Sequence, residues 1–235
     1  MPSALVTGAA VRVGQGLAMH LAHRGYDVAL HYHSSPPEET LDYCRRAGVR
    51  ARAFRCDLQD LPRVEELIGQ VLDEFPDLSV LVNSAANFIQ ENTERTSLET
   101  LEQSLRVNLM APFVLMREYK RRVNRGLIVN ILDERIERAL PAFAAYSVSK
   151  AGLAHLTRLA AVEWGRTVRV NGIAPGLILP PAGRGPDYLE QHKGDNPMET
   201  HGRVDDLARA LDYLLDSPFV NGDILFVDGG EHLMS

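Results

Sequence analysis

A regular alternation of short apolar runs with segments of helical periodicity constrains the fold of this chain more than any other feature. The apolar runs predict seven strands, at residues 4–6, 27–31, 51–55, 78–82, 127–131, 169–173 and 223–227. The intervening segments predict helices at residues 14–24, 38–47, 62–75, within 98–122, 144–163 and 204–215. Strands that alternate with helices in this way form parallel sheets with right-handed crossovers. We therefore expect an α/β fold, a doubly wound seven-stranded parallel sheet with helices on both faces.

The length and composition favour one domain. The chain has 235 residues, 45% of them hydrophobic, and shows no linker, internal repeat or low-complexity tract. We expect a single domain over residues 1–235. The stretch 177–202 is rich in proline and glycine, and a broken tract of this length inside a compact domain is typical of a lid or binding loop. We expect this loop, with a short helix near 188–192, to determine substrate choice.

Charge and cysteine content exclude several classes of function. A formal net charge of −6 argues against a general nucleic-acid binder or a binder of anionic membranes. No window approaches the ~18 apolar residues of a membrane span, and no charged leader precedes the first apolar run. Cys44 and Cys56 form neither a disulfide framework nor a metal-ligand pattern. We expect a cytoplasmic protein without a metal site, acting on a small molecule.

The stretch from Ala144 to Lys150 carries the chemistry. In a helix, Tyr146 and Lys150 are four residues apart and project from one face. A phenol titrates near pH ~10, so it exchanges a proton at neutral pH only when a nearby cation stabilises the phenolate. Lys150 is placed to be that cation. Taken alone, this pair is also common in helices where the tyrosine packs and the lysine is solvated.

Three further features accompany the pair. A turn, Thr7-Gly-Ala-Ala-Val-Arg-Val-Gly14, lies between the first strand and the first helix, Asn83 ends the fourth strand, and Asp133 precedes Tyr146 by thirteen residues. Together these motifs resemble the short-chain dehydrogenase/reductase family over nearly the whole chain. The resemblance implies a Rossmann fold that binds a nicotinamide dinucleotide, with Lys150 lowering the pKa of Tyr146.

The resemblance also implies a supporting residue and an assembly. Asn108 matches the residue that kinks the long helix in the family and holds a water leading to Lys150. An asparagine inside a helix is otherwise a mild propensity defect. The family further implies a homotetramer built on the long helices, and the tail 227–235 is a candidate for the same interface.

We expect the turn after the first strand to bind a pyrophosphate, because backbone N–H groups and the positive end of a helix dipole meet there. It resembles the family's T-G-x-x-x-G-x-G motif, with Arg12 in place of the middle glycine. We favour a contact from Arg12 to a cofactor or substrate phosphate. The alternative is a surface charge.

The end of the second strand indicates which dinucleotide binds. An acidic residue there pairs with the ribose hydroxyls of NAD, but this strand ends in Leu30-His31-Tyr32-His33-Ser34 without an acid. We therefore expect NADP(H), with Arg12 nearby. Ser34 stands where related enzymes carry an arginine, and the two histidines are alternatively packing and surface residues.

The remaining cofactor contacts follow from the resemblance. Asp57 and Leu58 match residues at the adenine, and Pro175 and Gly176 match the loop under the nicotinamide. No hydroxyl follows that loop in residues 177–180, so backbone groups are expected to hold the carboxamide. The full set implied for the cofactor is Gly8, Arg12, Val13, Tyr32, His33, Ser34, Asp57, Leu58, Asn83, Ala85, Tyr146, Lys150, Pro175 and Gly176.

Asp133 departs from the family, most members of which carry a serine at this spacing. An ionised carboxylate repels the oxyanion that develops when a ketone is reduced, so aspartate disfavours that reaction. A carboxyl group suits a nitrogen heterocycle, because it accepts from or donates to ring nitrogens as its protonation changes. The alternative is that Asp133 only begins a solvated charged run, 133–138.

Three features converge on one branch of the family. The arginine inside the turn, the His31-Tyr-His33-Ser strand end and the Asp133-to-Tyr146 spacing resemble pteridine reductases and the related dihydromonapterin- and dihydrofolate-reducing enzymes. Phe88 matches the aromatic ring that stacks on the pterin there, its alternative being a plain core residue. The resemblance implies that NADPH reduces a C=N bond while Tyr146 and Asp133 supply the proton.

Two other functions compete. A carbonyl or 3-oxoacyl reductase of the same family would share the chemistry of Tyr146 and Lys150, but it predicts a serine at Asp133. An NADP-sensing protein without turnover has no need of Asn108, Tyr146 and Lys150 together.

Overall fold

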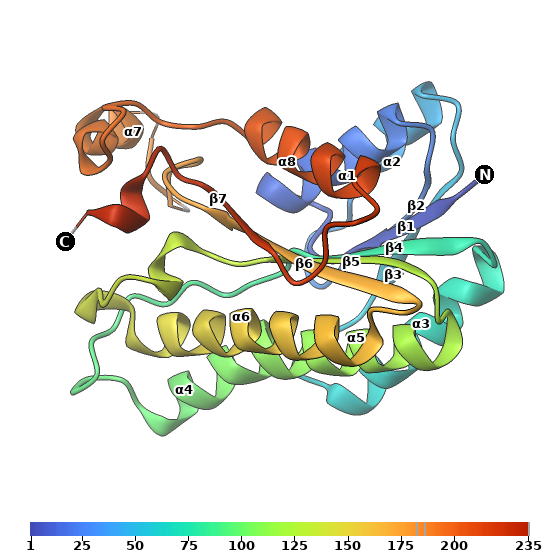
Figure 1. The fold of residues 1–235 in the computed structure, drawn as a ribbon, viewed down its shortest axis with the longest axis horizontal. Helices are drawn as coiled ribbons and strands as arrows, with labels where there is room; N and C mark the ends of the chain where they lie inside the picture. Colours follow the sequence, from blue (N-terminus) through green and yellow to red (C-terminus); the bar gives the residue numbers. More distant parts are fainter. Residues whose placement is uncertain (182, 186, 235) are drawn as a thin grey trace.

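The computed structural model describes residues 1–181, 183–185 and 187–234. Ala182 and Pro186 of the predicted loop 177–202, and Ser235 of the tail, lie outside the described residues. Within the described part, seven parallel strands form one sheet in the order β3-β2-β1-β4-β5-β6-β7 (Figure 1). The predicted doubly wound sheet is confirmed.

The strands and helices lie within a few residues of their predicted places. The strands are β1 (Ser3–Val6), β2 (Asp27–Tyr32), β3 (Ala51–Arg55), β4 (Leu78–Asn83), β5 (Gly126–Ile131), β6 (Val168–Pro175) and β7 (Ile224–Val227). The α-helices are α1 (Arg12–His23), α2 (Glu38–Arg46), α3 (Leu61–Glu74), α4 (Leu98–Leu105), α5 (Ala111–Arg122), α6 (Ala144–Trp164), α7 (Asp187–His192) and α8 (Val204–Asp216). Short turns of 3-10 helix are η2 (Glu134–Ile136), η3 (Pro141–Phe143), η4 (Lys193–Asp195) and η5 (Glu231–Leu233).

The helices cover both faces of the sheet, as Figure 1 shows: α1, α2 and α8 lie on one face and α3 to α6 on the other. Two apolar clusters fill the two interfaces, one around Leu17, Leu30 and Leu211 and the other around Leu81 and Leu115. Parallel strands buried on both faces require near-continuous apolar sequence, which is why the strands appear as apolar runs.

The long helix predicted within 98–122 is interrupted. A five-residue π-helical segment, η1 (Arg106–Met110), joins α4 to α5, and the fully buried Asn108 lies inside it. Single π turns inside helices frequently occur at functional sites. The predicted irregularity at Asn108 is therefore present as a π turn.

The loops that carry the predicted chemistry follow the carboxyl ends of the parallel strands and so gather at one end of the sheet. Strands β1 to β3 are added toward one side of the sheet and β4 to β7 toward the other, so the strand order reverses between the neighbours β1 and β4, and ligands bind at such a switch point. Figure 1 shows α7 and the C-terminal turn at the same end of the molecule as the segment before α6. The ends of the loop 177–202 are joined there, because the Gly202 N–H donates to the Leu177 carbonyl at 3.0 Å. No helix among the described residues is long and apolar enough to cross a membrane.

Candidate active site

Tyr146 and Asp133 are in direct contact. The Tyr146 hydroxyl in the first turn of α6 donates to Asp133 Oδ2 at 2.8 Å. Asp133 follows β5 and caps η2, where its Oδ1 accepts from the Arg135 backbone N–H at 3.0 Å and from Arg135 Nη1 at 2.9 Å. Asp133 thus faces the tyrosine and does not lie in a solvated loop.

Lys150 lies one helical turn further along α6 and is buried. Its Nζ donates to the Ile131 carbonyl at the end of β5 at 2.7 Å and lies 5.7 Å from the centre of the Tyr146 ring. Burial lowers the pKa of Lys150 to about 8, against a smaller opposing effect of Asp133. The two side chains share one face of the helix, as the spacing predicts.

We expected Lys150 to lower the pKa of Tyr146, and for this geometry that prediction is wrong. Burial, followed by the neighbouring Asp133 carboxylate, raises the pKa of Tyr146 well above its ordinary value. The lysine ammonium lies near the ring and bonds to a backbone carbonyl, so it does not outweigh these two effects. A phenol held in its protonated form is a proton donor, which suits the reductive direction.

Asn108 connects the π turn to α6. Its Nδ2 donates to Ser149 Oγ at 3.0 Å and to the Asn87 carbonyl at 3.1 Å, and its Oδ1 accepts from the Asn87 N–H at 2.9 Å. Ser149 in turn donates to the Tyr146 carbonyl at 2.6 Å. Asn108 thus ties the loop after β4 to the turn of α6 that carries Tyr146. Sequence reasoning missed Ser149, although it directly precedes Lys150.

An aromatic cluster adjoins the Tyr146 ring. Phe88 is 44% exposed, so the plain core alternative does not hold. Its ring stacks on Phe143, with centroids 4.6 Å apart, and meets Tyr146 edge-on at 4.7 Å. The Arg135 guanidinium lies 4.9 Å from the centre of the Phe143 ring. Phe143 and Arg135 were not predicted from the sequence, because only the fold brings η2 and η3 together with the loop after β4.

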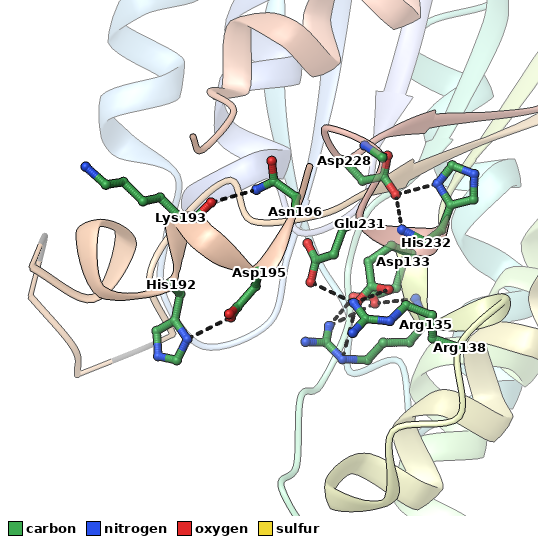
Figure 2. Close-up of polar contacts among 12 residues, drawn as sticks. Asp133, Arg135, Arg138, His192, Lys193, Asp195, Asn196, Asp228, Glu231 and His232 are labelled. Atoms are coloured by element: carbon green, nitrogen blue, oxygen red, sulfur yellow. Dashed lines mark hydrogen bonds and ion pairs between the residues drawn. The ribbon is translucent and has the colours of Figure 1, made fainter. Parts of the chain in front are cut away.

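Figure 2 shows a polar network that the sequence did not reveal. Arg138 Nη1 lies 3.4 Å from Glu134 Oε2 and 3.2 Å from Glu231 Oε1, so it joins the segment after β5 to the C-terminal turn η5. Burial is the main cause that raises the pKa of Glu134 to about 7 and that also raises the pKa of Glu231. This network fixes the segment that carries Asp133 and Arg135.

The turn after β1 has the form of an anion cradle. Gly8 has a φ of +67°, and a side chain there would meet Ala85 Cα at 3.0 Å, while a side chain at Gly14 would meet the Gly8 carbonyl at 2.3 Å. Among the described residues, no side chain caps the N-terminus of α1, and its first turn carries no acid. Its backbone N–H groups are therefore available to an anion, and the cradle fits a dinucleotide pyrophosphate.

Arg12 and Thr7 shape the turn between β1 and α1 in different ways. Arg12 is exposed, begins α1 and has a φ of 59°, the left-handed conformation that explains why glycine is usual there. Thr7 Oγ1 accepts from the Ser84 N–H at 2.9 Å and from the Ala85 N–H at 3.0 Å, which ties the turn to the loop after β4.

The other predicted cofactor residues lie along the same sheet edge. Tyr32, His33 and Ser34 are half-buried or exposed at the end of β2, and His33 Nε2 lies 3.6 Å from Asp57 Oδ2. Asn83 donates to Asn130 Oδ1 at 2.8 Å, and its own Oδ1 is buried without a hydrogen-bond partner among the described residues. The remaining members are Val13, half-buried on α1, Leu58, buried after β3, and Pro175 and Gly176, half-buried at the end of β6.

Comparison with known proteins identifies similar chains. The family model described as enoyl-(acyl carrier protein) reductase matches residues 8–232. A short-chain type dehydrogenase/reductase of Picea abies is 30% identical over 247 residues, which cover 97% of this chain and 91% of that protein.

Two solved structures are similar over the whole chain. The structure of FolM alternative dihydrofolate reductase 1 from Brucella suis, in complex with NADP, has a TM-score of 0.93 at 28% identity and covers 100% of this chain and 96% of that one. Acetoin dehydrogenase from Enterobacter cloacae has a TM-score of 0.92 at 27% identity, with coverages of 100% and 96%.

Proposed function

The chain belongs to the short-chain dehydrogenase/reductase family of oxidoreductases, and we propose that it uses NADPH to reduce a C=N bond of a dihydropterin or dihydrofolate-like heterocycle. The observation that carries this proposal is the 2.8 Å hydrogen bond from Tyr146 to the Asp133 carboxylate. A pair of acids beside an exposed aromatic ring suits protonation of a ring nitrogen.

NADP(H) is the proposed cofactor. The uncapped N-terminus of α1 and the Gly8 turn receive the pyrophosphate, and the acid-free end of β2 accepts a 2′-phosphate without repulsion. Asp57 and Leu58 would hold the adenine, Asn83 and Ala85 are also assigned to the cofactor, and Pro175 and Gly176 would lie at the nicotinamide. Bound NADPH supplies the hydride. The NADP complex of the Brucella suis protein supports this assignment.

The proton comes from the Tyr146 hydroxyl. Its raised pKa keeps it protonated, so it donates to the ring nitrogen that becomes negative as hydride reaches the adjacent carbon. The one hydroxyl proton lies in the hydrogen bond to Asp133, so the hydroxyl must turn from the carboxylate to the ring nitrogen in order to donate it, while Arg135 Nη1 stays bonded to both carboxylate oxygens. Lys150 keeps a positive charge close to the ring of Tyr146 and offsets the phenolate charge that forms after transfer. Asn108 fixes this turn of α6 through Ser149.

Substrate binding is assigned to Phe88 and the loop 177–202. The exposed face of Phe88 offers a stacking surface for a flat heterocycle, which both binds the ring and aligns it. Arg12 is placed for a phosphate of cofactor or substrate.

A carbonyl reductase is the second candidate, favoured by the similarity to acetoin dehydrogenase. It requires Asp133 to sit beside a developing oxyanion, which its negative charge disfavours. A non-catalytic NADP sensor is less well supported, because Tyr146, Lys150 and Asn108 are joined in one buried arrangement.

The proposed assembly is a homotetramer built on α4 to α6. Met110 of η1, Phe113 of α5 and Val162 of α6 are large apolar side chains with exposed fractions up to 88%. Leu233 and Met234 of the C-terminal tail are also exposed and are assigned to the assembly. Sedimentation of the wild-type chain and of Phe113→Glu tests this: a tetramer that the variant dissociates supports it, and a wild-type monomer contradicts it.

A spectrophotometric screen of NADPH oxidation tests the proposed reaction. Dihydrobiopterin, dihydromonapterin, dihydrofolate and a small diketone are compared at matched concentrations. We expect turnover of at least one heterocycle and little of the diketone. Turnover of the diketone alone supports the carbonyl reductase. NADPH binding without oxidation of any of the four supports the sensor.

A further inference from the structure

His31 lies near the carboxyl end of β2, among the residues assigned to the cofactor, and takes part in none of the chemistry described above. It is the penultimate residue of β2 and is only 2% exposed. Its Nδ1 accepts from the Gly8 N–H at 3.2 Å, and its Nε2 lies 3.0 Å from the Cys56 carbonyl. Both ring nitrogens of a buried imidazole are therefore engaged by backbone groups of two other segments.

These partners determine the form of the ring. A carbonyl only accepts hydrogen bonds, so Nε2 carries the proton, and a backbone N–H only donates, so Nδ1 is bare. Burial lowers the pKa of His31 to about 4, with a smaller lowering effect of His33 and opposing effects of the Cys56 carbonyl and Asp57. The imidazole is thus neutral with its proton on Nε2, a tautomer assigned here from the hydrogen bonds.

The two segments held by the ring carry different parts of the proposed cofactor site. Gly8 opens the turn between β1 and α1, which receives the pyrophosphate. Cys56 immediately precedes Asp57, which is assigned to the adenine. Backbone bonds from Ala9 N–H to the His31 carbonyl and from Cys56 N–H to the Tyr32 carbonyl, each 3.0 Å, connect both segments to the same strand end.

We propose that His31 is a positioning residue for the dinucleotide, whose imidazole sets the spacing between the pyrophosphate turn and the adenine-binding end of β3. This role rests on the proposed NADP(H) site. The ring occupies the Gly8 N–H and fixes the direction of the turn, while the N–H groups at the start of α1 remain available to phosphate. A leucine of similar volume would fill the space but would leave the Gly8 N–H and the Cys56 carbonyl buried without these partners.

Three variants separate the two contacts. His31→Asn keeps an acceptor near the place of Nδ1, His31→Gln keeps a donor near the place of Nε2, and His31→Leu keeps neither. His20→Leu is the matched control, because His20 on α1 is partly buried and bonds through its ring to Asp212 of α8, away from the turn. Dissociation constants for NADPH and NADH are measured by fluorescence titration without substrate, and thermal unfolding is followed in parallel.

We expect His31→Leu to weaken NADPH binding by at least about tenfold, with His31→Asn and His31→Gln in between. His20→Leu is expected to lower the unfolding temperature with NADPH affinity within about twofold of wild type. With a substrate that the wild type reduces, His31→Leu is expected to raise the KM for NADPH, while kcat at saturating NADPH changes less than about twofold. If His31→Leu does not fold, the Asn and Gln variants decide the question by the same measurement.

Several results overturn the proposal. Folded His31 variants that bind NADPH as tightly as wild type would remove the positioning role and leave the proposed function intact. A wild-type chain that binds neither NADPH nor NADH would overturn the proposed function, and this role with it. Nitrogen-15 chemical shifts of the His31 ring provide a check without any ligand: a proton on Nδ1, or a cationic ring at pH 7, contradicts the geometry.

Discussion

The Tyr146 hydroxyl donates a 2.8 Å hydrogen bond to Oδ2 of Asp133, and Arg135 Nη1 donates to both oxygens of the same carboxylate, at 2.9 Å to Oδ1 and 3.1 Å to Oδ2. A proton donor thus bonds to a carboxylate at the place where most of the family carries a serine hydroxyl. The charge on this carboxylate disfavours an oxyanion next to it and tolerates a ring nitrogen that gains a proton. The proposed substrate class depends on this contact.

Replacement of Tyr146 by phenylalanine removes the proposed proton donor. We expect kcat to fall by at least about 100-fold, while the Kd for NADPH stays within about twofold. Tyr119→Phe is the control, because the buried Tyr119 hydroxyl bonds to the Arg125 carbonyl far along α5 and should affect stability alone. Steady-state kinetics and NADPH titration of both variants check this, and retained turnover in Tyr146→Phe would remove the residue from the mechanism.

The pKa of Lys150, lowered to about 8, predicts an alkaline limit to activity. The side chain is cationic at pH 7 and loses its charge as the pH rises through about 8, so kcat should decrease there. Lys150→Arg keeps its charge to much higher pH. Its kcat should be lower overall but level across pH 7–10. A wild-type profile that stays level to pH 10 would show that the lysine charge is not needed.

Glu134 predicts a dependence of stability on pH. Its pKa is raised to about 7 in the folded chain, above the ordinary carboxyl value, so the folded state holds more protons than the unfolded state between the two values. The contribution of this group to stability therefore falls as the pH rises from about 4.5 to 7 and is then constant. Glu134→Gln should be more stable than wild type by about 1–3 kcal/mol at pH 8 and not at pH 4.5. Urea unfolding at both pH values measures this, and an equal difference at the two would contradict it.

Arg12 predicts opposite effects on stability and binding. Its φ of 59° is strained for any residue with a side chain, so Arg12→Gly should stabilise the free protein by about 1 kcal/mol. Loss of the guanidinium should weaken NADPH several-fold and leave NADH little changed. Thermal unfolding and titrations with both dinucleotides test this. Unchanged NADPH affinity would support the alternative that Arg12 is a surface charge.

The fold could be predicted from the sequence because the inner strands, such as β1 and β5, are buried on both faces and the long helices pack one face on the sheet. The helix around Tyr146 and the strand end at Asn83 fall where these patterns place them. Contacts between distant loops could not be predicted in this way. Phe143 on Phe88 and Arg138 on Glu231 depend on the meeting of chain segments at the sheet edge.

The direction of the Tyr146 pKa shift was also beyond the sequence. The spacing of Tyr146 and Lys150 predicts that they share a helix face, but not that the ammonium bonds to the Ile131 carbonyl. Burial of the phenol, which the spacing does not report, then has the largest effect on its pKa. His31 shows the same limit, since its two backbone partners lie in other strands' loops.

The role of Asp133 is tested most directly by the ratio of kcat/KM for a dihydropterin to kcat/KM for a small diketone, measured in the wild-type protein and in Asp133→Ser. If the carboxylate beside Tyr146 selects a ring nitrogen over a ketone oxygen, the ratio is high in the wild type. It should then fall by at least about tenfold when serine restores the usual hydroxyl. An unchanged ratio, or a wild-type preference for the diketone, would contradict the account.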